Sequence, residues 1–473
     1  MKRILQMTKR FKYICFILML CGFTGELQAQ IRLTLDSCRT LALEGNRQAL
    51  SARTGLQKAE QEVKAYRANF LPRIYAQGMY AYTSSDFRYR KTYPLFDVDA
   101  LRAAMDQTPM PDWEKQFFSQ VFARAEADLD LWLKPRHVTF SGIRFEQPLY
   151  MGGKIATAFK MAQTGRRMAQ LNVTRTDAET ILKTEEAYWE YVKVIELNRV
   201  ALRYRQAVES VAKDVKNGVA TGMLAENDRM KAQVKLGEAR QKVRETENGM
   251  RLARMNLCMI AGLNLLTSIV PADTLPDVQP TVLPENIPDV SVRQEYALLN
   301  QQLELKKQQI HLVRSEFMPQ LTLMGGYNYI NGILLNDTKL FNRPSLSAVV
   351  SLTIPLTPWI EGSHRVHSAK ADLLLAEYQM QEAADLLYLE MVKAWNRWDE
   401  ALLKADVARD EYLQTQEHLR VVNDRYELEM ETFSALLEAQ ALQQDAHRRY
   451  IEASVDLHMA KTIYRRVTGD TVH

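Results

Sequence analysis

An internal duplication constrains this chain more than any other feature of its sequence. The segment at 69–72 (N-F-L-P) recurs at 316–319 (E-F-M-P), an offset of 247 residues, and Pro148-Leu149 recurs as Pro355-Leu356 at an offset of 207. The second offset persists along the chain and also links Ala187 with Ala394, Ala239 with Ala446 and Gly262 with Gly469. A repeat of this length predicts that the fold contains two copies of one structural unit.

The two copies differ in length at one place, because the offset falls by 40 residues between the two prolines of each copy. The additional residues of the first copy belong to a long loop, 84–136, whose counterpart in the second copy is 331–344. We place the first repeat at 30–262 and the second at 290–473. The linker between them, 263–289, cannot form a continuous helix. Its prolines are Pro271, Pro276, Pro280, Pro284 and Pro288.

The first 29 residues have the layout of a secretory signal peptide. A basic stretch precedes an apolar run from Tyr13 to Phe23, and a polar segment ending at Ala29 follows. The run is 11 residues long and therefore too short to cross a bilayer as a helix. A lipoprotein signal around Cys21 is the alternative, although bulky Leu20 occupies the position where a small residue is wanted. We expect an exported protein without a helical membrane anchor.

Charge and cysteine content exclude two classes of protein. After removal of residues 1–29 the chain keeps 56 basic and 56 acidic residues, so it has no basic surplus for binding nucleic acid. Only Cys38 and Cys258 remain. One bridge between them is possible, but the mature chain is not a disulfide scaffold.

Long helices with a heptad pattern are expected in both repeats. Apolar and small residues are spaced alternately four and three apart, as in Ala232, Leu236, Ala239 and Val243. A sustained period of 3.5 residues predicts left-handed supercoiling of packed helices. The expected helices lie at about 33–70, 154–219 and 222–262 in the first repeat and at about 290–317, 362–427 and 429–469 in the second.

Four segments are expected to form strands, at about 73–82, 137–148, 320–330 and 345–356. The last alternates well, with Leu346, Val350 and Leu352 on one side and serines on the other. About ten residues is the length that a tilted strand needs to cross a bilayer. Four strands cannot close a barrel, and open strand edges are not tolerated in lipid, so strands from several chains must combine.

With these elements assigned, the sequence resembles the TolC-type outer-membrane efflux protein family over nearly the whole mature chain. T-L-D-S-C-R-T-L-A-L-E-G-N (34–46) resembles the family's opening helix, and T-G-M-L-A-E-N-D (221–228) resembles the turn at the far tip of its helical hairpin. Q-P-L-Y-M-G-G-K (147–154), echoed by I-P-L-T-P-W-I-E-G (354–362), resembles the junction between strand and helix. The junction residues that we assign are Pro72, Pro148, Gly152, Gly153, Pro319, Pro355 and Gly362.

The resemblance implies an α+β membrane protein. Three chains, each giving four strands, would form a 12-stranded transmembrane β-barrel in the outer membrane of a Gram-negative bacterium, continued by a long coiled-coil α-helical barrel in the periplasm. It implies a passive exit duct of an efflux or type I secretion system, a homotrimer that works with a periplasmic adaptor protein and an inner-membrane pump. It implies no cofactor and no catalysed reaction. It does not specify the substrate, and the loops at 84–136 and 331–344 would lie side by side outside the cell.

The resemblance also implies a periplasmic gate, held shut by polar links between the tips of the two helical hairpins. Aligned on the tip turns, Gly222 corresponds to Glu429, and the family's gate acid and tyrosine are present as Asp228 and Tyr426. A hydrogen bond between Tyr426 and Asp228 is therefore expected. The family's arginine is replaced by Glu431, so its charged link is lost or rebuilt with Arg229 or Arg425. Glu438 keeps a further acid, and the residues expected to touch the adaptor are Gly222, Met223, Leu224, Glu429 and Met430.

The sequence contains no convincing catalytic or metal-binding motif. His364 and His367 lie three apart on an expected helix, but no nearby cysteine or acidic cluster completes a metal site. A soluble periplasmic coiled-coil scaffold is the alternative to a channel. It would explain the heptads but not the four strands. A secreted enzyme is disfavoured because the sequence shows no catalytic triad or metal cluster.

Overall fold

The structure is a computed structural model, which describes residues 31–94, 97–123, 126–276, 283–284, 286–340, 343–356, 359–428 and 430–469. The expected signal peptide and Glu429 lie outside these residues. The chain divides into two compact units. The helical unit comprises the described parts of Met1–Gln61, Gln163–Leu305 and Leu373–His473, and the strand unit comprises those of Glu62–Ala162 and Lys306–Asp372.

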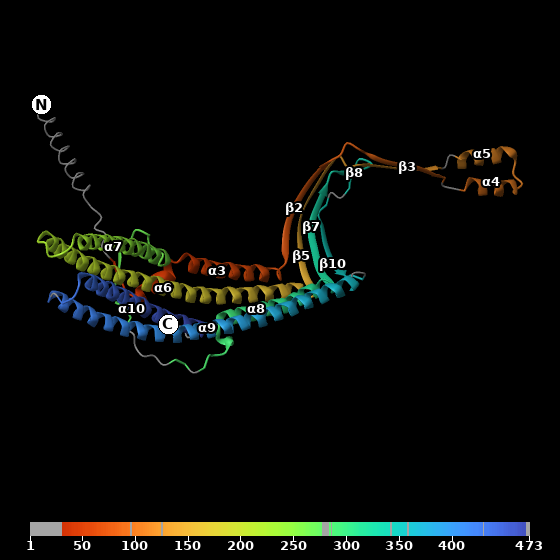
Figure 1. Ribbon diagram of the computed structural model, residues 1–473. Helices are drawn as coiled ribbons and strands as arrows, with labels where there is room; N and C mark the ends of the chain where they lie inside the picture. Colours follow the sequence, from red (N-terminus) through yellow and green to blue (C-terminus); the bar gives the residue numbers. More distant parts are fainter. Residues whose placement is uncertain are drawn as a thin grey trace, which may run out of the picture. The chain divides into compact units, whose positions relative to one another are not determined.

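The helices reproduce the duplication of the sequence (Figure 1). In the first repeat they are α2 (Leu35–Gly45), α3 (Arg47–Ala68), α6 (Lys154–Ala220) and α7 (Glu226–Ile260). The second repeat has a short 3₁₀ turn (Val290–Val292), α8 (Gln294–Ser315), α9 (Trp359–Glu427) and α10 (Phe433–Val467). Helices α7 and α10 are both 35 residues long, and both of their ends differ by the offset of 207.

The first helix is not continuous, which corrects the expectation of one helix over 33–70. Asn46 has an extended backbone (φ −68°, ψ 128°) and separates α2 from α3. Its side-chain oxygen accepts from the backbone N–H of Gln48 at 2.8 Å, and its amide donates to the carbonyl of Ile260 at 2.9 Å. Asparagine is a favoured residue for such a cap. The break also brings the backbone of Gly45 against that of Gly262, where a side chain would not fit.

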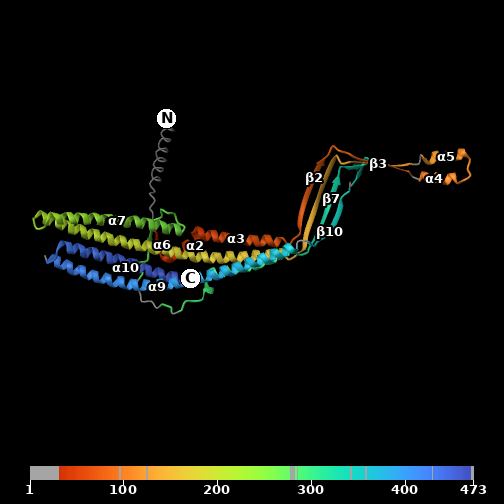
Figure 2. The ribbon, with the colours of Figure 1, turned by 45° about the vertical axis from the view of Figure 1, so that its right-hand side comes forward.

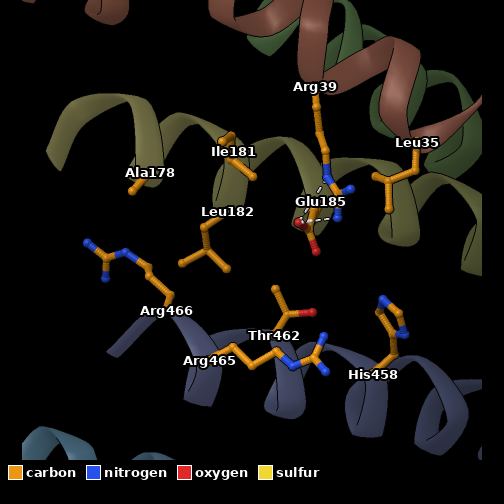
Figure 3. A pocket seen from close by; sticks show the side chains of 10 residues that line it. All are labelled: Leu35, Arg39, Ala178, Ile181, Leu182, Glu185, His458, Thr462, Arg465 and Arg466. Carbon is orange, nitrogen blue, oxygen red and sulfur yellow. Dashed lines mark hydrogen bonds and ion pairs between the residues drawn. The ribbon is translucent and has the colours of Figure 1, made fainter. Parts of the chain in front are cut away.

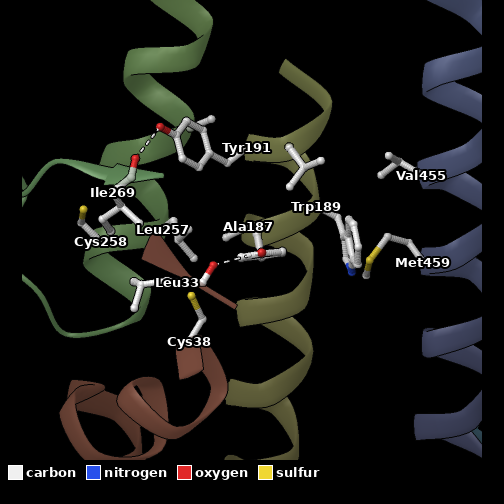
Figure 4. Close-up of a cluster of buried hydrophobic side chains, with 13 residues drawn as sticks. Leu33, Cys38, Ala187, Trp189, Tyr191, Leu257, Cys258, Ile269, Val455 and Met459 are labelled. Carbon is white, nitrogen blue, oxygen red and sulfur yellow. Dashed lines mark hydrogen bonds between the residues drawn. The ribbon is translucent and has the colours of Figure 1, made fainter. Parts of the chain in front are cut away.

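The core of the helical unit forms where α6 crosses the start of the chain (Figure 4). Strand β1 (Ile31–Leu33) pairs in parallel with β6 (Ile269–Pro271). The buried hydroxyl of Tyr188 donates to the Asp273 carboxylate at 2.6 Å, and that carboxylate accepts from the backbone N–H of Leu35 at 3.0 Å. Burial, and then the Asp273 carboxylate, raises the pKa of Tyr188. These bonds attach the N-terminal residues to α6.

The strand unit contains one antiparallel sheet of four strands in the order β10-β7-β5-β2. Its strands are β2 (Arg73–Tyr82), β5 (His137–Met151), β7 (Gln320–Asn331) and β10 (Ser345–Thr353). Three bounds differ from expectation, and that of β7 differs by one residue only. Strand β5 continues three residues past Pro148, with a register shift at this proline, and β10 ends at Thr353 rather than at 356. A proline at a bulge is consistent with its missing N–H.

The long loop of the first repeat is folded, which corrects its description as a loop. It contains β3 (Phe87–Pro94), α4 (Val98–Asp106), α5 (Asp112–Ala123) and β4 (Glu126–Lys134). Its counterpart forms β8 (Ile333–Leu335) and β9 (Thr338–Leu340), and β4 pairs with β8 in a second sheet of order β3-β4-β8-β9. The expectation that the two segments lie side by side is thus confirmed. Figure 2 shows α4 and α5 beside each other beyond β3.

Candidate functional site

The register of the four-stranded sheet assigns its side chains to two different faces. Directly opposed residues of paired strands lie on the same face. Leu346 is opposite Tyr327, Tyr327 is opposite Ile143, and Ile143 is opposite Ala76, so one face can be followed across all four strands. We call this the apolar face. Its large side chains are Ile74, Tyr80, Tyr82, Ile143, Phe145, Leu321, Leu323, Tyr327, Tyr329, Leu346, Val350 and Leu352.

The apolar face is uncovered in the single chain. Leu346 is 85% exposed, and Ile74, Val350 and Leu352 are also exposed. The tyrosines gather at the end of the sheet that leads to the second sheet, where Tyr80 bonds the ring nitrogen Nδ1 of His137 at 2.9 Å. A band of aliphatic side chains bordered by aromatic ones is typical of a surface that faces lipid.

The opposite face, which we call the mixed face, carries all three charged side chains of the paired strands: Arg73, Arg144 and Glu146. Arg73 is directly opposite Glu146. The Arg144 guanidinium lies over the ring of Tyr75, 5.5 Å from its centroid. Uncharged polar side chains from β2, β7 and β10 join them, with apolar ones between. They are Gln77, Gln320, Thr322, Asn328, Ser345, Ser347, Ser351 and Thr353.

The sheet ends in two open edges within one chain. Strands β2 and β10 are its outermost members, and among the described residues neither pairs with a further strand on its outer side. The rest of the strand unit buries few side chains that could form a core for this sheet. The residues of the strand unit that are buried in the described chain are all small: Ser315, Gly325, Gly326, Gly362 and Ala369. A sheet with this composition is incomplete as it stands.

The expected junction residues lie close to the points where strands and helices meet, and Gly362 is already in the first turn of α9. Gly152 and Gly153 form the turn from β5 to α6 with φ values of 62° and 84°. A Cβ at Gly152 would lie 2.5 Å from Met318, and one at Gly362 would lie 2.7 Å from the ring of Phe317. Both glycines therefore permit a close approach that a larger residue would block. Of the prolines, Pro148 lies within β5, and Pro72, Pro319 and Pro355 lie in the connections next to strands.

The tips of the helical hairpins are exposed and apolar. Gly222 has φ 76° in the turn between α6 and α7, and Met223 is 82% exposed. Leu224 covers Gly218, where a Cβ would lie 2.8 Å from the leucine side chain. Met430, at the other tip, is exposed as well.

Tyr426 and Asp228, which the sequence expectation links, are not hydrogen-bonded to each other in the described chain. Tyr426 packs against an apolar cluster of Val215, Ala232, Phe433 and Leu437, which joins the two hairpins near their tips. Burial raises the pKa of Tyr426, and the carboxylate that adds to this is Asp214. Asp228 instead forms an ion pair with Lys231 at 3.7 Å. The sequence did not predict this apolar contact between Tyr426 and the cluster that contains Phe433.

The two arginines that could rebuild the charged link between the hairpins each pair within their own hairpin in the described chain. Arg425 lies 3.6 Å from Glu431, whereas Arg229 bonds Glu226 within its own helix turn. Glu438 is exposed and lines a groove between α7 and α10, together with Lys231 and Glu238. Acidic and basic side chains are thus concentrated on the tips.

A small cavity of about 150 Å³ lies between α2, α6 and α10 (Figure 3). Its buried Glu185 accepts from Arg39 at 2.6 and 3.1 Å, and Arg466 lies 3.5 Å from Glu295. These pairings explain the charged lining as structural. Nearby, Cys38 and Cys258 are buried free thiols rather than a bridge, and burial raises the pKa of Cys38 to about 11.

Two kinds of feature are absent from the described residues. They contain no cluster of three or more His, Cys, Asp or Glu that could hold a metal ion, and His364 and His367 gain no third partner. None of the described helices is both long and apolar enough to cross a membrane.

Comparison with known proteins identifies the architecture. Residues 295–469 match the family model described as outer membrane efflux protein. No curated protein matches the chain by sequence. The CmeC outer membrane channel of Campylobacter jejuni aligns with a TM-score of 0.70 at 15% identity, covering 92% of this chain and 85% of its own. The outer membrane protein VceC of Vibrio cholerae aligns with a TM-score of 0.69 at 12% identity, covering 92% and 96%. The MtrE outer membrane channel of Neisseria gonorrhoeae gives 0.67 at 15%, covering 92% and 88%.

The family resemblance indicated by the sequence motifs is therefore confirmed, by sequence in the second half of the chain and by fold over most of its length. The α+β fold class is confirmed as well. At these identities the solved structures carry the fold alone to this chain.

Proposed function

We propose that this chain is the subunit of a trimeric outer-membrane channel, the passive exit duct of an efflux or type I secretion system. Three copies place twelve strands in one barrel in the outer membrane of a Gram-negative bacterium, and their helices continue the duct into the periplasm. The partners are a periplasmic adaptor protein and an inner-membrane pump. The chain itself needs no cofactor and catalyses no reaction.

The two-faced, open sheet is the observation that carries this proposal. A soluble scaffold has no use for exposed Leu346, Val350 and Leu352 on one surface, and unpaired strand edges favour pairing with another chain. Closing β2 of one copy against β10 of the next satisfies both edges and turns the apolar face toward lipid. The charged side chains Arg73, Arg144 and Glu146 then line the interior, where water can solvate them.

The helix tips are the gate and the adaptor contact in this proposal. Exposed Met223 and Met430 and half-buried Leu224, with Gly222 and Glu429, form the apolar tip that meets the adaptor. Glu431 and Glu438 repeat three times around the entrance, and clustered carboxylates in a constriction favour cations. The pair of Arg425 and Glu431 restrains the tip of the second hairpin, and Asp228 and Tyr426 lie on the neighbouring elements.

Planar-bilayer recording of the purified protein tests the proposal. We expect a small, cation-selective conductance in the closed state. Glu438→Gln should weaken the selectivity, and Arg425→Gln should raise the conductance modestly, because an exposed ion pair contributes only about 0–1 kcal/mol. Lys307→Gln, far from the tips in sequence, is the control. An anion-selective pore would show that the carboxylates are wrongly placed at the entrance, and the absence of any conductance would refute the channel function.

A further inference from the structure

The ribbon formed by β3 and β4 has two chemically different faces. The register pairs Phe87 with Leu133 and Tyr89 with Leu131, and paired residues share a face. We call this the apolar ribbon face. It consists of Phe87, Tyr89, Tyr93, Leu129, Leu131 and Leu133, with the Lys91 ammonium 4.7 Å from the ring centroid of Tyr93. Phe87 is 62% exposed, and Tyr89, Tyr93 and Leu129 are exposed as well.

The other face of the ribbon makes its contacts within the chain. Arg88 bonds the Asp130 carboxylate at 2.9 and 2.5 Å, and Arg90 bonds it at 3.0 Å. These hydrogen bonds hold the pKa of Asp130 well below its usual range. The Lys134 ammonium lies 3.3 Å from the ring centroid of Trp132. The charges of this polar face are therefore paired within the chain and can remain in water, whereas the apolar ribbon face exposes aromatic and aliphatic side chains.

The helical hairpin of α4 and α5 at the end of the ribbon also exposes apolar side chains. Trp113, Phe117 and Val121 follow one another at intervals of four along α5, so they lie along one side of the helix. Trp113 is 67% exposed, and the other two are exposed. None of the described side chains between Asp97 and Val121 is buried. An isolated two-stranded ribbon is marginally stable, and an exposed apolar patch of this kind marks an interaction site.

The strand order indicates what covers this surface. The edges of the four-stranded sheet are β2 and β10, and the edges of the second sheet are β3 and β9. Along the chain β2 leads into β3, and β9 leads into β10. Each edge of the first sheet is thus continuous with an edge of the second. Closing β2 against β10 of a neighbouring copy therefore also brings β3 toward that neighbour's β9.

We propose that residues 87–134 of three copies pack on one another through the apolar ribbon face and the stripe of Trp113, Phe117 and Val121, capping the barrel mouth at the end opposite the helices. This inference rests on the proposed trimer, and its occupant is a second copy of the same chain. Substrate leaving the duct would then have to pass or part the cap. The channel would thereby have a second constriction besides the helix tips.

Photocrosslinking in intact cells tests this arrangement. A benzoyl-phenylalanine placed at Phe117 of the full chain replaces one exposed aromatic side chain by another, so folding should be preserved. The matched control carries the same probe at exposed Asp106 on α4. We expect crosslinked dimers and trimers of the chain from position 117. Their yield should be about tenfold above that from position 106, because only position 117 would lie against another copy, at the high effective concentration within a trimer. The mass of each detergent-solubilised complex is measured in parallel.

The outcomes separate this inference from the proposed function. Self-crosslinking at 117 within a trimer supports the cap. A trimer whose position 117 crosslinks to no copy, or only to a different protein, overturns the cap and leaves the channel intact. A complex that is not a trimer removes the basis of both proposals.

Discussion

The helical unit and the strand unit solve the problem of burial in opposite ways. The helical unit encloses large side chains within one chain, and Tyr188, Leu257, Met391, Leu436 and Ile451 are fully buried. In the strand unit Ala369 is the only apolar side chain, among those described, that is buried. One unit can therefore be judged from a single chain. The other has almost no core within one chain, and under the proposed function lipid and further copies cover it.

The largest effect is expected from a charge on the apolar face. Val350 and Val349 are neighbours on β10, 63% and 52% exposed, but they lie on opposite faces of the sheet. Arginine on a lipid-facing strand costs about 2–4 kcal/mol at the membrane midplane, and the trimer would contain it three times. Val350→Arg should abolish assembly in the outer membrane, measured by fractionation and detergent extraction. Val349→Arg, facing the interior, should assemble; equal loss in both variants would show that the faces are wrongly assigned.

A smaller effect is expected within the helical unit, at the hydrogen bonds that attach the N-terminal residues to α6. Asp273→Ala removes the acceptor of the Leu35 N–H and leaves the buried Tyr188 hydroxyl with the Leu33 carbonyl at 3.1 Å as its acceptor. It should therefore lower the free energy of unfolding by about 1–3 kcal/mol. Loss of helical circular dichroism on heating measures this. Asp36→Ala removes an exposed carboxylate that only pairs with Arg39, and it should change the unfolding temperature little. If Asp273→Ala proved as stable as Asp36→Ala, the hydrogen bonds of Asp273 would not be what attaches the N-terminal residues to α6.

The smallest effect is a dependence of stability on pH, and we expect it to arise in the helical unit, which contains His447 and His458. Burial lowers the pKa of both His447 and His458, and neighbouring cations act in the same direction. The folded state thus binds fewer protons than the unfolded state. This contribution to stability is present above the ordinary histidine pKa and is lost as the pH falls below it. His447→Gln with His458→Gln should reduce the drop in unfolding temperature between pH 7.5 and 5.5. His418→Gln, at an exposed position, is the control, and an unchanged drop in the double variant would exclude these histidines.

Much of the fold could be predicted because periodicity and duplication are properties of the sequence. Residues 73–82 coincide with β2, and the segment at 320–330 differs from β7 by one residue. Alternation of side chains is a local signal, so strand positions follow from it. The equal offsets of α7 and α10 follow from the repeat in the same way.

Other features could not be predicted, because they depend on contacts between distant residues. The break at Asn46 depends on the carbonyl of Ile260, more than two hundred residues away. The sequence predicts a loop at β3 and β4, because the helical hairpin of α4 and α5 interrupts the alternation of apolar and polar side chains. At the tips, the aligned motifs predict a hydrogen bond between Tyr426 and Asp228. In the described chain Tyr426 packs instead against the apolar cluster that contains Phe433.

The most direct test of the central claim, that other copies complete the strand unit, is the mass of the detergent-solubilised protein by light scattering. The account predicts a complex of three subunits that retains its strand signal in infrared spectra. The strand signal should disappear when the complex is dissociated, while the helical signal persists, since only the helical unit buries a core of its own. A stable monomer with the full strand content would contradict the account.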